Sequence, residues 1–151
     1  MTLSLQEISD RMEIQDLCYH YADIIDRHAF DELVDVFTED AHIDYSEVGG
    51  SEGGLAETID FLKKAMTMFP NYHHLNANLQ IKVDGETATG RIMCFNPMEV
   101  PNEDGSVAMM MVGIWYVDKY LRTAQGWRIT RRAEEKSYMF HSSQFGQPSA
   151  G

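Results

Sequence analysis

The sequence has few basic residues. It contains 12 lysines and arginines against 24 aspartates and glutamates, which gives a formal net charge of −12. Nucleic acids and anionic membrane surfaces attract basic patches, whereas the arginines near the end of the chain (Arg128, Arg131 and Arg132) are interleaved with acidic residues. We therefore expect neither a nucleic-acid partner nor a membrane partner.

Long apolar runs are missing too. No segment stays apolar over the roughly 20 residues that a bilayer requires, and the N-terminal "MTLSLQEISDRMEI" lacks the basic and apolar parts of a signal peptide. Cysteine is scarce as well, because only Cys18 and Cys94 occur, and each lies in an apolar pattern. Buried free thiols in a reducing, cytoplasmic setting are therefore expected.

The usual patterns of cofactor and metal sites are absent. The glycine-rich run "GGSEGG" has no strand-turn-helix unit around it, so it is a flexible turn and not a dinucleotide fingerprint. The histidines show no His-x3-His spacing, and no cysteine cluster accompanies them. The sequence predicts a function that uses no cofactor and no metal.

Three segments of the chain show the spacing of apolar residues that is typical of helices. Apolar residues three and four apart predict helices over residues 5–27, 30–37 and 55–69. In the first helix the row Ile14, Cys18, Ala22 advances by four, and its next member is Asp26. This spacing predicts that the Asp26 carboxylate points inward at the edge of the apolar face.

The remainder alternates between apolar and polar residues. Strands are expected over residues 41–46, 75–83, 87–95, 107–123 and 127–140, the last four joined by hairpin turns. Helices followed by an antiparallel meander indicate an α+β fold. We expect one domain, residues 1–151, in which a long curved sheet wraps around N-terminal helices and encloses a cone-shaped pocket for a small apolar or cyclic molecule. The exposed face of the long strands predicts a homodimer or homotrimer.

Three segments resemble one known family. "EIQDLCYHYADIIDRHAFDELVDVFTEDAHIDY", "HHLNANLQIKVDGETATGR" and "GWRIT" are similar to the SnoaL-like branch of the nuclear-transport-factor-2-like (NTF2-like) superfamily. The nearest pattern is that of scytalone dehydratase, bile-acid dehydratase and hexachlorocyclohexane dehydrochlorinase. The resemblance covers nearly the whole chain and implies a cystatin-like α+β barrel, a fold that by itself hosts unrelated functions.

Enzymes of that branch share an aspartate–histidine pair. The resemblance implies that Asp26 and His74 form this pair and that two tyrosines, Tyr21 and Tyr45, face the pocket. It also implies that substrate contacts Arg132, Asn78, Asn96 and Met93. Asn96 stands where the bile-acid enzyme has an aspartate, and Ile92 and Met93 stand where scytalone dehydratase has a second histidine. The leaving-group machinery of those enzymes is therefore incomplete here.

The implied pair has a definite chemistry. A neutral imidazole, with an ordinary pKa near ~6.5, is suited to removing a carbon-bound proton at neutral pH. A carboxylate on the other ring nitrogen fixes the tautomer and stabilises the imidazolium. The prediction is a cofactor-independent lyase of the dehydratase type, acting on a small cyclic, largely apolar substrate. An isomerase or polyketide-cyclase-type enzyme is one alternative, and a non-catalytic ligand-binding or assembly module is another.

Three assignments have a simpler interpretation. Asp26 is alternatively a structural carboxylate that binds a backbone amide. Strict alternation places His73, and not His74, on the apolar face of its strand, although a β-bulge would exchange the two. Arg132 is alternatively a solvated residue of the last strand.

Overall fold

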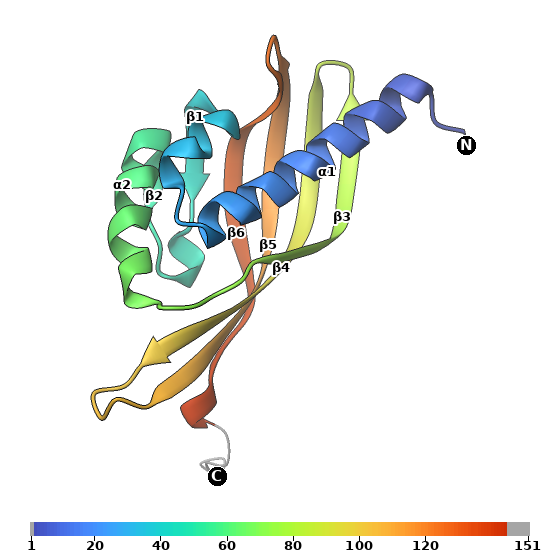
Figure 1. Ribbon diagram of the computed structural model, residues 1–151. Coiled ribbons are helices and arrows are strands. Elements are labelled where there is room, and N and C mark those ends of the chain that lie inside the picture. Colours follow the sequence, from blue (N-terminus) through green and yellow to red (C-terminus); the bar gives the residue numbers. More distant parts are fainter. Residues whose placement is uncertain (1, 145–151) are drawn as a thin grey trace.

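The computed structural model describes residues 2–144, as helices packed on one six-stranded sheet (Figure 1). The helices are α1 (Leu5–Asp26), α2 (Leu55–Ala65) and the short 3-10 helices η1 (Phe30–Asp35), η2 (Ser46–Val48), η3 (Met66–Met68) and η4 (Ser142–Gln144). The strands are β1 (Phe37–Asp44), β2 (Glu52–Gly54), β3 (Leu75–Asp84), β4 (Thr87–Pro101), β5 (Val107–Thr123) and β6 (Gly126–His141). The predicted α+β class is confirmed.

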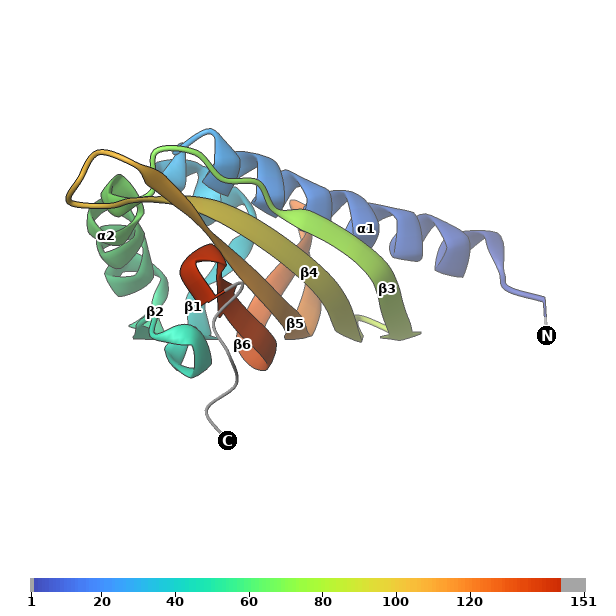
Figure 2. The same cartoon turned by 90° about the horizontal axis from the view of Figure 1, so that it is seen from below.

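The sheet is mixed, and most of its pairings are antiparallel. Its strand order is β2-β1-β6-β5-β4-β3, and β1 runs parallel to β6 while every other neighbouring pair is antiparallel. Helix α1 lies across one face of the curved sheet, and α2 lies beside β1 and β2 (Figures 1 and 2). The core lies between α1 and the sheet, as the sequence predicts.

Helix α1 begins and ends at defined residues. The Ser4 hydroxyl accepts a hydrogen bond from the Glu7 amide at 3.1 Å and so caps the N-terminus. The row of residues four apart is buried, Cys18 completely. Asp26 is the last helical residue, and the chain then turns at His28, whose positive φ of 59° is incompatible with a continuing helix. The turn leaves the Asp26 carboxylate at the end of the buried face.

An irregularity in β3 decides which histidine faces the interior. The pairing of β3 with β4 shifts register between Ala77 and Gln80, and Asn78 inside this stretch has a positive φ of 49°. The additional residue reverses the alternation of side chains along the strand. His74 therefore faces inward and His73 outward, while the apolar residues after the bulge still pack against the core.

Several segments differ from the sequence prediction. The first strand covers residues 37–44 instead of 41–46, the second helix is the 3-10 helix η1 over residues 30–35, and the helix expected over residues 55–69 is α2 followed by η3. The run "GGSEGG" is not only a turn, because its second half forms β2, in which Glu52 pairs with Asp44 of β1. Strand β4 extends to Pro101 instead of ending at Phe95, because β5 is long enough to pair with it throughout. Both strands depend on a partner strand, which local propensity does not reveal.

The far ends of β4 and β5 form a hairpin that extends beyond the body of the molecule (Figure 1). Val107 on this hairpin and Tyr138 and Met139 on β6 have exposed side chains. Such exposed apolar residues are compatible with self-association. The homodimer or homotrimer stays a prediction.

Candidate active site

The structure brings Asp26 and His74 together at the junction of α1 and β3. His74 Nδ1 lies 2.8 Å from Asp26 Oδ1. The backbone amide of His74 also donates to both carboxylate oxygens, each at 3.1 Å. The same carboxylate therefore forms the contact expected of a catalytic pair and the backbone bond expected of a structural residue.

The arrangement sets the state of the imidazole ring. With Nδ1 donating to the carboxylate, the neutral ring carries its lone pair on Nε2. Among the described residues Nε2 has no hydrogen-bond partner, and the His74 side chain is 9% exposed and lines a cavity. The basic Nε2 atom therefore lies at the cavity wall, and the bond to Asp26 on the other side of the ring fixes its orientation.

The cavity beside His74 has a volume of about 320 Å³. Most of its wall is apolar, formed by α1, α2 and the inward faces of the strands, with a methionine-rich lining: Met66, Met68, Met98, Met110 and Met139. Polar side chains also reach it from several elements: Tyr21, Tyr45, His74, Asn96, Tyr116 and Glu134. This combination of an apolar wall with a few polar groups is typical of a small-molecule site.

A second, wider hollow lies on the other side of the pair. It has a volume of about 1030 Å³ and is lined by Asp26, His73 and His74 among others. Asp26, 21% exposed, contacts this outer groove, whereas His74 contacts both hollows. The histidine thus separates the carboxylate from the apolar cavity.

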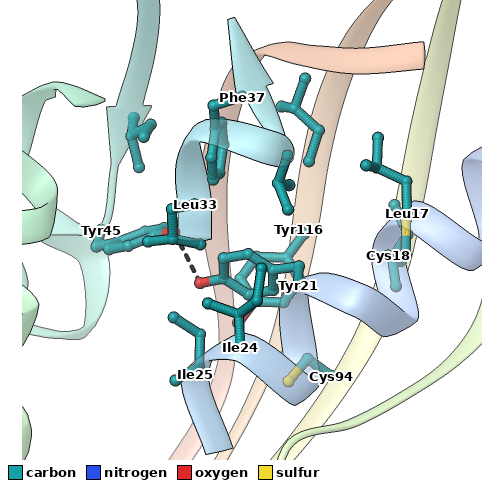
Figure 3. Close-up of a cluster of buried hydrophobic side chains, with 14 of the residues drawn as sticks. Leu17, Cys18, Tyr21, Ile24, Ile25, Leu33, Phe37, Tyr45, Cys94 and Tyr116 are labelled. Carbon is teal, nitrogen blue, oxygen red and sulfur yellow. Dashed lines mark hydrogen bonds between the residues drawn. The ribbon is translucent and has the colours of Figure 1, made fainter. Parts of the chain in front are cut away.

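Three tyrosines form the part of the cavity wall nearest to α1. The hydroxyls of Tyr21 and Tyr45 are hydrogen-bonded at 2.7 Å, and the Tyr116 ring packs edge-on against Tyr21 with centroids 5.6 Å apart (Figure 3). Burial raises the pKa of all three phenols, and the nearby Arg132 charge opposes that rise without cancelling it. These hydroxyls therefore remain neutral and can donate hydrogen bonds.

Arg132 lies behind this wall and not in the cavity. It is completely buried and forms two bonds to Asp118, Nε to Oδ1 at 2.8 Å and Nη2 to Oδ2 at 2.6 Å. Its guanidinium lies 4.2 Å from the ring centroid of Tyr21 and 4.1 Å from that of Tyr116. The interpretation of Arg132 as a solvated strand residue is wrong, and the structure places it outside the cavity lining that a substrate-binding role requires.

The three other predicted substrate contacts divide into two groups. Asn96 is buried, lines the cavity and donates to the carbonyl oxygen of His73 at 2.7 Å, next to the His74 ring. Asn78 is exposed and contacts Met93, Nδ2 to Sδ at 3.7 Å, and neither residue lines the cavity. The prediction that Asn78 and Met93 contact substrate is corrected, because the β3 bulge turns Asn78 outward and Met93 lies on the opposite face of β4 from Asn96.

Sequence reasoning missed Glu134 and Tyr116. Tyr116 lies in a long apolar strand, where nothing distinguishes it from a core aromatic residue. Glu134 lies within the charged run "RRAEEK", where it is two residues after Arg132 and so shares its face of β6. That spacing was the available signal, but it becomes informative only once Arg132 is known to face inward.

Residues 2–144 contain neither a metal-binding cluster nor a membrane-spanning helix. No group of three or more histidine, cysteine, aspartate or glutamate side chains there is arranged to hold a metal ion. No helix of that part of the chain is both long and apolar enough to cross a membrane. Both cysteines, Cys18 and Cys94, are buried and free.

Comparison with known proteins gives a consistent family signal. Residues 6–133 match the SnoaL-like domain. Rv2910c, an uncharacterised protein of Mycobacterium tuberculosis, is 44% identical over 136 residues, which cover 90% of this chain and 91% of the relative.

Solved structures agree with this signal at the level of the fold. Type 2 hexachlorocyclohexane dehydrochlorinase (LinA) superimposes with a TM-score of 0.80 at 17% identity, over 97% of this chain and 98% of its own. A Novosphingobium aromaticivorans protein described as a candidate scytalone dehydratase superimposes with a TM-score of 0.76 at 20% identity, over 88% of this chain and 87% of its own. An NTF2-like protein with a cystatin-like fold from the same organism superimposes with a TM-score of 0.68 at 23% identity, over 88% of this chain and 85% of its own. The predicted NTF2-like, cystatin-like fold is thereby confirmed.

Proposed function

Because the chain belongs to the SnoaL-like family, we propose that it is a cofactor-independent lyase that uses His74 as a general base and eliminates water from a small cyclic, largely apolar substrate. The observation that carries the proposal is the 2.8 Å contact between His74 Nδ1 and Asp26 Oδ1, with the ring at the cavity wall. A non-catalytic carrier of the same fold has no need of this contact. Dehydratases and dehydrochlorinases among the structural neighbours are compatible with the reaction class, although they share only the fold.

The first step of the proposed reaction is removal of a proton from a carbon next to a carbonyl group. Nε2 of His74 takes the proton, and Asp26 stabilises the imidazolium that forms. Negative charge then develops on the carbonyl oxygen. The Tyr21 and Tyr45 hydroxyls are neutral donors in the same cavity, and they stabilise that oxygen by hydrogen bonding.

The size of the cavity limits the substrate. A volume of about 320 Å³ is near the lower end of ligand pockets. We propose a molecule of one or two fused rings, since a four-ring steroid would fill or exceed this space. The methionine-rich wall accommodates flat, apolar rings of varied shape.

The test uses a β-hydroxy ketone of the tetralone type, whose loss of water gives a naphthol that is measured by its fluorescence. We expect turnover by the wild-type protein and a loss of about 1000-fold or more in His74→Gln. The matched control is His73→Gln, the adjacent histidine that faces outward. Unchanged turnover in a folded His74→Gln variant would refute the proposal.

The same arrangement would support an isomerase, which moves a proton without releasing a leaving group. The hydrogen-bonded phenols of Tyr21 and Tyr45 are compatible with this second candidate too, because an enolate intermediate needs such donors in either reaction. Conversion of a β,γ-unsaturated cyclic ketone into its conjugated isomer, with no dehydration of the hydroxy ketone, would identify the isomerase.

A further inference from the structure

The cavity contains an acidic side chain, Glu134, that the base-catalysed step leaves without a role. Glu134 lies on β6, where it pairs with Tyr116 of β5, and it lines the same cavity as His74. Its Oε2 atom is buried and has no hydrogen-bond partner among the described residues. A buried polar atom needs a hydrogen-bond partner, and at a cavity wall a ligand atom can supply one.

The groups around Glu134 determine its protonation state. Those facing it are Arg132 on its own strand, Asp44 of β1, Glu47 of η2 and the neutral phenols Tyr21, Tyr45 and Tyr116. Burial raises the pKa of Glu134 to about 8; Asp44 and Glu47 add to the rise and the Arg132 charge opposes it. At neutral pH the carboxyl group therefore carries a proton that it can donate.

We propose that Glu134 is the general acid of this site, which protonates the departing hydroxyl group while His74 removes the proton from carbon. This inference rests on the proposed function and adds the leaving-group half of the reaction. The assignment requires only that the acidic C–H bond and the hydroxyl group of the substrate lie on adjacent carbons, as in the hydroxytetralone used as the probe.

The arrangement of the strands supports this division of roles. His74, immediately before β3, and Asn96 of β4 line one side of the cavity, and Tyr116 of β5 and Glu134 of β6 line the other. A substrate between them contacts a base on one side and an acid on the other. The family pattern offers no second histidine or aspartate for the leaving group in this chain, where Ile92 is buried apolar core and Asn96 is an amide. Glu134 supplies the missing proton donor from a different strand.

The reaction balances without a co-reactant. Nε2 of His74 takes the carbon-bound proton, and that electron pair forms the C=C bond. The C–O bond to the hydroxyl group breaks with its electrons on oxygen, and the Glu134 carboxyl proton joins them to release water. The site is left with an imidazolium and a carboxylate, and transfer of one proton from His74 to Glu134 through solvent restores it. The sum is hydroxy ketone to unsaturated ketone plus water.

Two probes separate the acid from the base. The hydroxytetralone needs both groups to lose water, whereas tetralone itself, which lacks the hydroxyl group, needs only the base to exchange its α-hydrogens in D₂O. We expect Glu134→Gln to slow dehydration at least about 100-fold and to leave the exchange rate within about threefold of wild type. Glu135→Gln, the exposed neighbour that pairs with Arg91, is the control and changes neither rate.

Dehydration by Glu134→Gln at the wild-type rate overturns the assignment of Glu134 and leaves the base intact. Loss of both reactions in a folded Glu134→Gln also overturns it, because the residue then serves binding or structure. Exchange retained in His74→Gln, or a wild-type protein that catalyses neither reaction, overturns the proposed function and the assignment with it.

A pH profile and an infrared spectrum give independent readouts. We expect kcat/KM for dehydration to fall above about pH 8, where Glu134 loses its proton, and the exchange reaction to lack this limb. The wild-type protein should show the infrared band of a protonated carboxyl group at neutral pH, absent in Glu134→Gln. A spectrum in which the two proteins do not differ would contradict the proposal even without a substrate.

Discussion

The row of residues four apart on α1 has an aspartate at each end, and the two have different surroundings. The Asp10 side chain is 3% exposed and contacts Arg122 at 2.7 Å and the indole nitrogen of Trp127 at 3.2 Å. Asp26, 21% exposed, binds the backbone and ring of His74 between the outer groove and the cavity. One helix face thus presents the same residue type to two different partners.

The partners determine what each carboxylate can do. Hydrogen bonding to Arg122, a permanent cation, lowers the pKa of Asp10 to about 2, so this charge is fully used in holding α1 to the sheet. The imidazole bound to Asp26 gains a positive charge only when it accepts a proton. The charge of Asp26 is therefore available to a reaction step, whereas that of Asp10 is committed to the fold.

Asp26→Asn is the strongest test of this contrast. We expect the rate of dehydration of the hydroxytetralone to fall about 1000-fold, because the amide no longer fixes the tautomer of His74 or stabilises the imidazolium. The melting temperature should change little, since the amide oxygen still accepts from the His74 backbone. Asp23→Asn, at an exposed position of the same helix, is the matched control. A rate close to wild type would make Asp26 a structural residue.

Asp10→Asn should show the reverse behaviour. Loss of the charge leaves Arg122 and Trp127 with a weaker acceptor, so the free energy of unfolding in urea should fall by about 2 kcal/mol. The dehydration rate of the folded protein should match wild type, because Asp10 does not line the cavity. If Asp10→Asn lost activity as severely as Asp26→Asn, the functional distinction between the two ends of α1 would be wrong.

Tyr45→Phe extends the comparison to the cavity wall. Removing one of two hydrogen-bonded phenols should lower kcat about tenfold, since Tyr21 still donates to the developing oxyanion. The exposed Tyr19 of α1 provides the control, Tyr19→Phe, with no expected change. An effect confined to KM would indicate that Tyr45 binds the ground state as strongly as the transition state.

The free energy of unfolding should depend on pH in opposite directions for Asp10 and Glu134, because the two pKa values are shifted in opposite directions. The pKa of Asp10 is lowered from 3.8 to about 2. Its ionised form therefore stabilises the folded protein above about pH 3.8, and this stabilisation is lost as the pH falls through about 2. The pKa of Glu134 is raised from 4.5 to about 8, so its contribution is present below about 4.5 and is lost as the pH rises to about 8.

Each replacement should therefore remove one slope, measured by urea unfolding across the pH range. Asp10→Asn should flatten the acid side, and Glu134→Gln should flatten the decline toward pH 8. Each slope is at most about 1.4 kcal/mol per pH unit, the limit for one proton. An unchanged decline in Glu134→Gln would show that its carboxyl group is already ionised in the folded protein.

The helical part of the site could be predicted because the helical period determines which side chains of a helix point toward the core. Four-residue spacing alone identifies Asp26 as inward-facing, and the contact with His74 agrees with it. The same row followed toward the N-terminus reaches Asp10, so this second buried carboxylate was within reach of the same argument.

The strand part of the site could be predicted only in part. Period two assigns alternate residues to two faces but does not say which face another element will cover. In β6 that cover comes from α1, which is distant in sequence and whose Tyr21 packs against Arg132. The burial of Arg132 and the inward position of Glu134 both follow from this cover, whereas the charged run itself is typical of a solvated strand.

The bulge at Asn78 has a consequence for how sequences of this kind diverge. With uninterrupted alternation, a strand that points its later apolar residues toward the core cannot also point His74 inward. One additional residue between the two parts of the strand allows both. A single-codon deletion at this point would shift the phase of the first half alone, turning the imidazole to solvent while the apolar half kept its contacts. Such a deletion would remove the proposed general base from the cavity in one step while the fold persisted.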